Sequence, residues 1–479
     1  MTIGQTLQHF AESALIRGYM FIDILVAEIG STTTLVNAFC GIGTGKPRFI
    51  AQGQAPTSVL DGDVRVGLAA AIEDMRVRLG ADKLEYGEMF ATSSAAGGLR
   101  MCVHGLIYDM TVKAAQAAAL GAGAIVRMAT AGKLSKYDLD DVKAEKPNLI
   151  LLAGGTDYGE RETALWNAEA IAQSGMKAPV IYAGNVQNRR AVEEIFANAG
   201  IPCYITENVY PKLDVLNIEP ARRIIHEVFE EHIVKAPGME HIRDMVAGSI
   251  MPTPGAVMEA AQLLYGDIGD LIVVDIGGAT TDVHSVTEGS DEISAILTSP
   301  EPMAKRTVEG DLGMYINAHN LVDMIGREKL DKELGIDVDK CMSAYEPIPR
   351  SEEQLKLTQR LCLEAGITAI KRHSGALRYI YTPSGRQTIA EGKDLTKLKY
   401  IVATGGALTR LPERRRIMRA MADCNSQRMM LYPKPDALEL MFDNDYIMAS
   451  LGVLSKRYPE DALALLKQSI VREQAETIR

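Results

Sequence analysis

The sequence predicts an α/β protein with two similar halves and an inserted parallel α/β unit. Apolar strands alternate with helices of about ten residues between positions 120 and 210. Two other apolar strands, which end near Glu28 and Asp275, deliver the same order of carboxylate, glycine and hydroxyl residues. A third strand, at 400–404, ends in a glycine pair.

The inserted unit is the most regular part of this pattern. Its alternation favours a parallel, doubly wound sheet. Upstream of it, residues 96–116 are rich in small side chains and are predicted to be helical. We place the first half at 21–95, the inserted unit at 96–235, and the second half, with a helical insertion, at 236–479. The predicted strands of the unit are 124–128, 149–153, 180–183 and 203–206, and its predicted helices are 138–146, 160–174 and 188–199.

The composition argues against several classes of function. The 479 residues carry a formal net charge of -11, so no nucleic-acid partner is expected. The six cysteines form no C-x-x-C pair, which argues against a zinc or iron–sulfur site. No apolar run reaches the roughly 18 residues that span a bilayer, and the first residues lack the pattern of a secretory signal. We therefore expect a cytoplasmic protein with no membrane partner.

Two strand–loop segments carry the predicted chemistry. The first, AEIGSTTT, runs from Ala27 to Thr34, and the second, VDIGGATTDVHS, runs from Val274 to Ser285. Glycine lets backbone N–H groups approach phosphate oxygens, and clustered N–H groups favour an anion. The carboxylate before the glycine can hold a hydrated Mg²⁺. A single copy is most often an ordinary strand-end turn, but two copies about 250 residues apart predict two halves that close on one nucleotide.

These motifs resemble those of the ATPase superfamily that contains actin, Hsp70 and the sugar kinases. The resemblance implies a duplicated ribonuclease-H-like fold that binds ATP and Mg²⁺ between its halves. It implies that Glu28 and Asp275 are catalytic carboxylates that hold the metal. Segment 443–454 resembles the closing helix of the superfamily, with Ala449 and Gly452 as small packing contacts. The resemblance implies a first phosphate motif of Gly30, Ser31, Thr32 and Thr33, a second of Gly277, Gly278, Thr280 and Thr281, and an adenosine motif of Gly405, Gly406 and Ala407.

Two features of these motifs leave alternatives open. The first motif usually has Asp where this chain has Glu28, and the extra methylene moves the carboxylate by about 1.5 Å. That shift either alters metal placement or slows hydrolysis, or else Glu28 simply holds Mg²⁺ through a different water. Glu309 and Asp311 lie in the block VEGDLGM at a predicted helix start, where acidic residues offset the helix dipole. Their alternative role is catalytic, near the γ-phosphate or the ribose.

Four blocks resemble one family of the superfamily, the glutamate mutase accessory proteins called MutL, which are unrelated to mismatch repair. The resemblance covers about residues 21–455. It implies a slow ATPase with a chaperone-like role, a reactivating factor that releases damaged cobalamin from an adenosylcobalamin-dependent mutase or aminomutase. Homo-oligomers are compatible with it. The blocks are LLAGGTDYGE (151–160), VDIGGATTDVHSV (274–286), KRTVEGDLGM (305–314) and VATGGALTRL (402–411).

The first of these blocks follows a strand of the inserted unit. Residues 154–157 there could contact a ligand, because ligands bind at the carboxyl ends of parallel strands. The alternative is a tight turn in which Thr156 or Asp157 caps the next helix. The strand order also resembles the cobalamin-binding domains of the mutases, although the Asp-x-His-x-x-Gly motif that supplies a histidine to cobalt is absent.

Other functions of the superfamily are alternatives to this one. A small-molecule kinase would need a catalytic Asp deep in the cleft and a substrate pocket, and the sequence identifies neither. An activator of 2-hydroxyacyl-CoA dehydratases would need a cysteine-ligated iron–sulfur cluster, which the scattered cysteines argue against. A filament-forming actin-like protein is a further alternative.

Overall fold

The computed structural model describes residues 18–30, 32–94, 99–233, 238–248, 250–383, 385–425 and 429–472. By their internal contacts these residues form two units. The first is Met1–Leu263 with Ile447–Leu466, and the second is Leu264–Tyr446 with Lys467–Arg479. The finer division into three domains, with boundaries at 95/96 and 235/236, stays a prediction.

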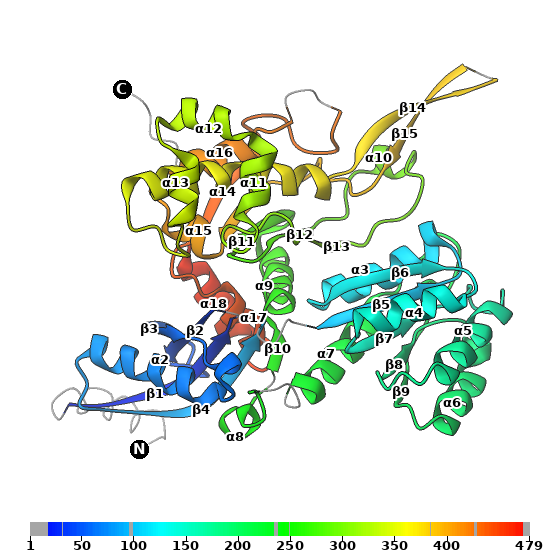
Figure 1. Ribbon diagram of the computed structural model, residues 1–479, viewed down its shortest axis with the longest axis horizontal. Coiled ribbons are helices and arrows are strands. Elements are labelled where there is room, and N and C mark those ends of the chain that lie inside the picture. The colour runs from blue at the N-terminus through cyan, green and yellow to red at the C-terminus, as the bar shows by residue number, and fades with distance from the viewer. Residues whose placement is uncertain are drawn as a thin grey trace. The chain divides into compact units, whose positions relative to one another are not determined.

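The first unit contains a mixed five-stranded sheet in the order β10–β4–β1–β2–β3 (Figure 1). The three strands that come first in the chain form an antiparallel meander, and β4 and β10 continue the sheet parallel to β1. Helix α2 (Val64–Leu79) follows the meander, and Asp63 accepts a hydrogen bond at its N-terminus. The strands are β1 (Tyr19–Ile29), β2 (Thr33–Cys40), β3 (Arg48–Pro56), β4 (Lys83–Ser93) and β10 (Ile250–Pro252).

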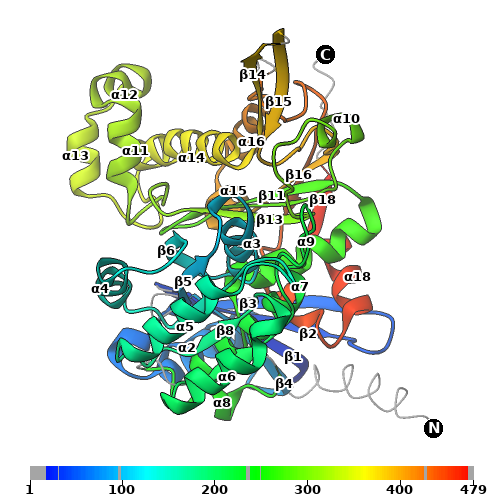
Figure 2. The same ribbon diagram turned by 90° about the vertical axis from the view of Figure 1, so that its right-hand side faces the viewer.

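A second five-stranded sheet in this unit is entirely parallel, with the order β6–β5–β7–β8–β9 (Figure 1). Figure 2 shows its strands β5, β6 and β8 from another side. The predicted doubly wound α/β insertion is therefore confirmed. The helix predicted over 96–116 is wrong in its first part, because Arg100–Gly105 forms the buried strand β5. The strands are β5, β6 (Ile125–Ala131), β7 (Leu149–Leu152), β8 (Val180–Tyr182) and β9 (Cys203–Ile205). The helices are η3 (Tyr108–Val112), α3 (Lys113–Gly121), α4 (Lys136–Glu145), α5 (Glu162–Gln173), α6 (Arg189–Asn198) and α7 (Glu219–Ile233).

The two sheets of the first unit share one apolar core. A single cluster of buried side chains contains Leu25 and Ala91 from the first sheet together with Val103 of β5 and Ala118 of α3. The other face of the parallel sheet packs in a separate cluster around Ile150. Removal of the inserted sheet would therefore expose the core of the first sheet to water.

The second unit repeats the topology of the first sheet. Its six strands have the order β13–β12–β11–β16–β17–β18, and β13, β12 and β11 form the same antiparallel meander as β3, β2 and β1. Two parallel strands again continue the sheet. This repetition is the duplicated ribonuclease-H-like fold. The strands are β11 (Leu271–Ile276), β12 (Thr281–Val286), β13 (Ala304–Glu309), β16 (Tyr400–Thr404), β17 (Glu439–Asp443) and β18 (Ile470–Arg472).

Helices and one hairpin complete the second unit. The predicted helical insertion is present between β13 and the hairpin, which is formed by β14 (Ala376–Thr382) and β15 (Gly385–Glu391) and extends away from the six-stranded sheet (Figure 1). No helix of the described residues is long and apolar enough to cross a membrane. The insertion consists of α11 (Ala318–Ile325), α12 (Arg327–Leu334), α13 (Val338–Ser343) and α14 (Glu352–His373). The remaining helices named below are α9 (Thr253–Ile268), α15 (Gly406–Arg410) and α17 (Met448–Leu454).

Candidate functional site

The two predicted phosphate loops close with the same backbone turn. In the first loop the Gly30 N–H donates to the Thr33 carbonyl at 3.0 Å, and in the second Gly277 donates to Thr280 at 3.0 Å. The strand registers Ile29↔Thr34 and Ile276↔Thr281 match as well. Thr281 is therefore equivalent to Thr34, which lies one residue beyond the predicted first motif. Thr32 is exposed in its turn, and Ser31 lies outside the described residues.

The Glu28 carboxylate is buried, with 6% exposure, and lies in a polar network within the first unit. Its Oε1 accepts hydrogen bonds from Ser450 Oγ at 2.6 Å and from Asn37 Nδ2 at 3.2 Å. Asn37 Nδ2 also donates to Ser450 Oγ at 2.8 Å, and Gln52 donates to Asn37. The side chain of Glu28 thus reaches from the end of β1 to the helix α17.

Helix α17 packs closely against α9 through small residues. A Cβ at Gly452 would overlap the carbonyl of Ala256 in α9, and Ala449 is buried. Both therefore pack as predicted, although residues 439–443 form β17 and the helix begins only at Met448. The close approach of α17 positions Ser450 at Glu28.

In the second unit, the loop after β16 packs directly against Asp275. Asp275 is half-buried at the end of β11, next to the parallel strand β16. Gly405 has a φ of 84°. A Cβ there would overlap the Asp275 carboxylate and lie 2.7 Å from the nitrogen and the oxygen of Ile276, so only glycine fits. Gly406, which begins α15, is exposed and has open space around its Cβ position, and Ala407 is half-buried.

The segment 309–316 is joined to the second loop by backbone hydrogen bonds. The Met314 N–H donates to Gly277 at 3.1 Å, and the N–H groups of Tyr315 and Ile316 donate to Gly278 at 2.8 and 2.9 Å. A Cβ at Gly313 would overlap the Ala279 backbone. The segments that contain Gly277, Gly313 and Gly405 therefore pack against one another around the second loop.

Glu309 and Asp311 do not lie at a helix start. Glu309 is the last residue of β13, directly opposite Thr281 of β12, and α11 begins only at Ala318. The helix-dipole interpretation of these acids is therefore wrong. The register places Glu309 beside the second loop instead.

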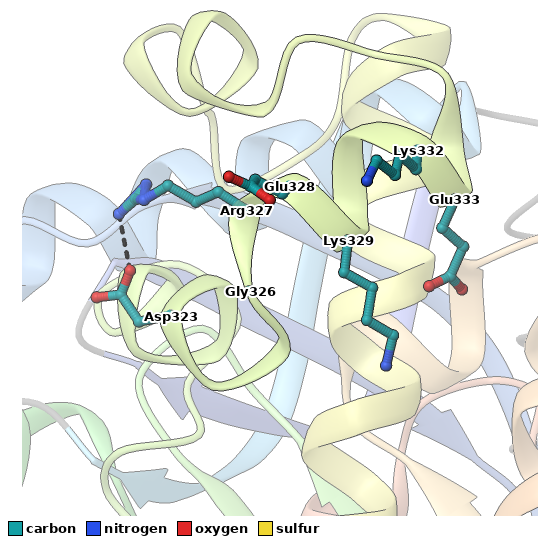
Figure 3. Close-up of a pocket in the computed structure, with 7 residues that line it drawn as sticks. All are labelled: Asp323, Gly326, Arg327, Glu328, Lys329, Lys332 and Glu333. Carbon is teal, nitrogen blue, oxygen red and sulfur yellow. Dashed lines mark hydrogen bonds and ion pairs between the residues drawn. The ribbon is translucent and has the colours of Figure 1, made fainter.

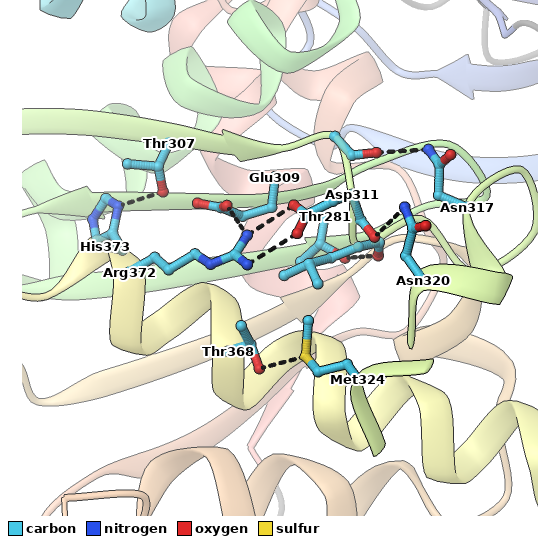
Figure 4. Close-up of polar contacts among 12 residues, drawn as sticks. Thr281, Thr307, Glu309, Asp311, Asn317, Asn320, Met324, Thr368, Arg372 and His373 are labelled. Carbon is cyan, nitrogen blue, oxygen red and sulfur yellow. Dashed lines mark hydrogen bonds and ion pairs between the residues drawn. The ribbon is translucent and has the colours of Figure 1, made fainter. Parts of the chain in front are cut away.

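Arg372, near the end of α14, holds both acids (Figure 4). Its Nη1 donates to Glu309 Oε2 at 2.6 Å and to Asp311 Oδ1 at 2.8 Å, and its Nη2 donates to Asp311 Oδ2 at 2.9 Å. Hydrogen bonding to the guanidinium lowers the pKa of Asp311, whereas burial raises the pKa of Glu309. The sequence pattern gave no indication of Arg372.

A buried ion pair lies beneath the second loop. Thr280 Oγ1 donates to Asp282 Oδ2 at 2.8 Å, and Arg306 Nε donates to Asp282 Oδ1 at 2.8 Å. A hydroxyl has one hydrogen to donate. Because Thr280 uses it on Asp282, a phosphate at this loop would meet backbone N–H groups rather than this O–H.

The block LLAGGTDYGE in the inserted unit forms an internally bonded turn. Asp157 Oδ1 accepts from Val186 N at 2.9 Å and from Asn208 Nδ2 at 3.0 Å. Glu160 Oε1, not Thr156 or Asp157, accepts from the Thr163 N–H in the first turn of α5. The predicted cap was therefore assigned to the wrong residue.

A wide, open depression lies over α11 and α12 (Figure 3). Arg327 there donates to Asp323 at 2.8 Å and to Asp339 at 2.9 Å. None of the sequence-predicted site residues lines it. Its lining residues are Asp323, Gly326, Arg327, Glu328, Lys329, Lys332 and Glu333.

The donor set suits Mg²⁺ better than a metal held by protein side chains alone. Within the described parts of the chain, no group of three or more His, Cys, Asp and Glu side chains is placed to hold a metal ion. Mg²⁺ usually keeps several waters and binds through one or two carboxylates plus substrate phosphates. A single carboxylate before each glycine loop fits that chemistry.

Comparison with known proteins identifies the family. The model of the MutL protein family matches residues 24–470. This chain belongs to the MutL family. It is 38% identical to Protein MutL of Clostridium tetanomorphum over 467 residues, which cover 94% of this chain and 99% of that protein. The MutL match includes both predicted phosphate loops, the inserted sheet and Gly405.

Solved structures resemble the chain only distantly. A nucleotide-free acetone carboxylase structure has a TM-score of 0.40 at 12% identity and covers 91% of this chain and 70% of its own. The ethanolamine utilization protein EutJ of Carboxydothermus hydrogenoformans has a TM-score of 0.28 at 12% identity, over 92% and 88% of the two chains. Component A of the (R)-2-hydroxyglutaryl-CoA dehydratase of Acidaminococcus fermentans has a TM-score of 0.27 at 10% identity, over 94% and 99%. These scores are too low to bear on function.

Proposed function

We propose that this MutL-family chain binds ATP with Mg²⁺ on its glycine loops and acts as a reactivating factor for an adenosylcobalamin-dependent mutase or aminomutase. In this proposal the chain is a slow ATPase that releases damaged cobalamin. Membership of the MutL family supports the accessory role. The resemblance of both loops to phosphate motifs supports the nucleotide.

One observation carries the nucleotide part of the proposal. Asp275, the turn Gly277–Thr280, Gly405 and the segment 309–316 meet within the second unit. Strand-end glycines leave backbone N–H groups accessible to an anion. Asp275 would hold Mg²⁺ through water. Glu28, which lies on β1 just before the equivalent loop of the first unit, would position metal and water rather than the purine. Gly405 and Gly406 allow a nucleoside to approach the backbone.

The inserted unit is proposed to deliver the ATP energy to the mutase. Its parallel strand order resembles that of the mutases' cobalamin domain, and it lacks the cobalt-binding motif. We expect it to compete for the surface on which that domain packs. A ligand shifts an equilibrium only through its differential affinity for two states. ATP should therefore change the affinity for the mutase, by a factor of about 5–150 for typical coupling.

Titration calorimetry of the full chain with Mg·ATP tests the nucleotide site. Gly278 is exposed, and its Cβ position lies 3.7 Å from Tyr315 Cβ, so the fold can accommodate a side chain there. Gly278→Val should keep the melting temperature but abolish Mg·ATP binding, because the branched side chain fills the phosphate approach. Gly266→Ala, at an open helical position, is the matched control. Unchanged Mg·ATP affinity in Gly278→Val would falsify the phosphate-loop assignment.

Reactivation of a mutase inactivated with cyanocobalamin tests the accessory role. Deletion of the inserted unit is unsuitable, because its core is continuous with that of the first sheet. Tyr108, Tyr158 and Leu213 are exposed in segments that follow the carboxyl ends of β5, β7 and β9. The triple change to Ser should leave Mg·ATP affinity unchanged and abolish reactivation. Full reactivation by this variant contradicts the role of the insert, and a failure of the wild type with every cobalamin mutase tested contradicts the accessory role.

A further inference from the structure

The acidic segment beside the second loop poses an electrostatic problem for an anionic ligand. Glu309 pairs with Thr281 across β13 and β12, and the chain that follows it is hydrogen-bonded to Gly277 and Gly278. Asp311, two residues after Glu309, and Asp275, just before the loop, are two more carboxylates there besides Asp282, which is already paired with Arg306. ATP carries several negative charges on its phosphates, so unneutralised carboxylates within a few ångströms of the loop would oppose its binding.

Arg372 is the cation that the structure places on these acids. Its guanidinium donates to both carboxylate oxygens of Asp311, which is the bidentate geometry that arginine favours, and to one oxygen of Glu309. Arg306, a second guanidinium at the loop, is buried and bonded to Asp282. Arg372 therefore cancels one unit of negative charge beside the phosphate turn, at every accessible pH.

A role for Arg372 in offsetting the helix dipole explains less of the geometry. Basic residues in the last turn of a helix offset its dipole, and Lys371 and Arg372 both lie in the last turn of α14. That role needs only a positive charge near the helix end. It does not account for a fork that joins two acids of another segment, with Glu309 only 13% exposed.

From this arrangement we infer that Arg372 is a positioning and charge-cancelling residue, which keeps the acidic segment 309–311 compatible with a polyphosphate at the second loop. The inference rests on the nucleotide binding proposed above. It assigns Arg372 an effect that grows with ligand charge. ATP should depend on it most, ADP less, and adenosine, which has no phosphate, not at all.

Calorimetric titrations of Arg372→Met with Mg·ATP, Mg·ADP and adenosine test the inference. We expect the Mg·ATP affinity to fall roughly tenfold, because the variant leaves one more negative charge uncancelled at a partly screened distance. The Mg·ADP affinity should fall less, and the adenosine affinity should be unchanged. The Mg·ATP loss should shrink at higher salt. Arg372→Lys, which keeps the charge but not the fork, should recover most of the affinity.

A charge-matched double variant separates charge cancellation from direct contact. Asp311→Asn with Arg372→Met restores the wild-type net charge beside the loop without restoring the guanidinium. Recovery of Mg·ATP affinity to within about threefold of wild type supports the inference, and no recovery overturns it in favour of a direct arginine–nucleotide contact. An equal loss for adenosine overturns it in favour of a structural role.

The matched control is Arg360→Met on the same helix. Arg360 also joins two acids, Glu333 at 2.9 Å and Glu364 at 3.0 Å, but neither belongs to the loop segment. Its loss should leave all three affinities unchanged. If the wild type itself binds no Mg·ATP, the proposed function fails together with this inference. If the wild type binds and the charge pattern is absent, only this inference fails.

Discussion

The loops after β1 and β11 share a backbone turn but place their carboxylates in different surroundings. Glu28 is buried and accepts hydrogen bonds from Asn37 and Ser450. Asp275 is half-buried and packs against Gly405. The longer side chain of the first loop thus reaches a distant helix, whereas the shorter one of the second loop lies against a neighbouring turn. A duplicated fold can keep its turn and still give the carboxylate of each copy different partners.

The largest effects should come from removing each carboxylate in turn. Asp275→Asn removes one charge from the proposed metal site and should weaken Mg·ATP by roughly 10–100-fold, the usual cost of disturbing an outer metal partner. Glu28→Gln should lose hydrolysis more than binding, because its carboxylate would position metal and water. Calorimetry and phosphate-release rates measure the two quantities. If Glu28→Gln loses Mg·ATP affinity and hydrolysis to the same extent, as Asp275→Asn does, the two carboxylates do not differ in role. Glu28 is then only a binding or folding residue.

The second prediction concerns the contact that brings α17 to Glu28. Gly452→Ala places a methyl group on the Ala256 carbonyl, so α17 must move. We expect a loss of about 1–3 kcal/mol in the free energy of unfolding, as for other overpacked sites. Trp166, the single tryptophan of the chain, lies in the first unit, so its fluorescence in a urea titration reports on that unit.

Gly266→Ala on α9 is the control for Gly452→Ala. It is a helical glycine of the second unit with no atom outside its own helix backbone within 4 Å of its Cβ position. Alanine there should be neutral or slightly stabilising, as measured for both variants by circular dichroism of the whole chain in the same urea titration. A Gly452→Ala variant as stable as wild type would mean that α17 does not need its close approach to α9.

The sequence predicts the repeated strand–loop units because their signals are local. Apolar runs, a carboxylate and glycines lie within a dozen residues of one another in both loops. It misses β5 because Arg100–Gly105 is followed by the small-residue helix α3, and the whole stretch has helical composition. It misses Ser450 and Arg372 because they come from helices more than 400 and 60 residues away from their partners, and only the folded chain reveals that pairing.

The third prediction tests whether Glu28 depends on its distant partner. Ser450→Ala removes a buried O–H donor and leaves the carboxylate with Asn37 as its side-chain donor among the bonds described here. We expect the free energy of unfolding to fall by about 1–3 kcal/mol, the usual cost when a buried polar group loses a partner. Ser455→Ala, at the half-buried residue directly after α17, should lower the free energy of unfolding by less than about 0.5 kcal/mol. Equal stabilities of the two variants contradict a role for Ser450 in holding Glu28.

The smallest expected effect is a difference in steric room between the turns at Gly30 and Gly277. A Cβ at Gly30 would lie 2.7 Å from the Thr33 carbonyl oxygen, whereas a Cβ at Gly277 would lie 3.4 Å from that of Thr280. Gly→Ala reduces the freedom of the unfolded chain equally at both sites, so that contribution cancels between the variants. Gly30→Ala should therefore lower the free energy of opening its hairpin by about 1 kcal/mol. Gly277→Ala should leave the free energy of opening of its own hairpin within about 0.5 kcal/mol of the wild-type value. Hydrogen-exchange mass spectrometry on peptides that cover each hairpin measures local opening directly. Equal loss of protection at both hairpins would show that the two turns share their steric tolerance as well as their hydrogen bond, and that only the carboxylates and their partners differ.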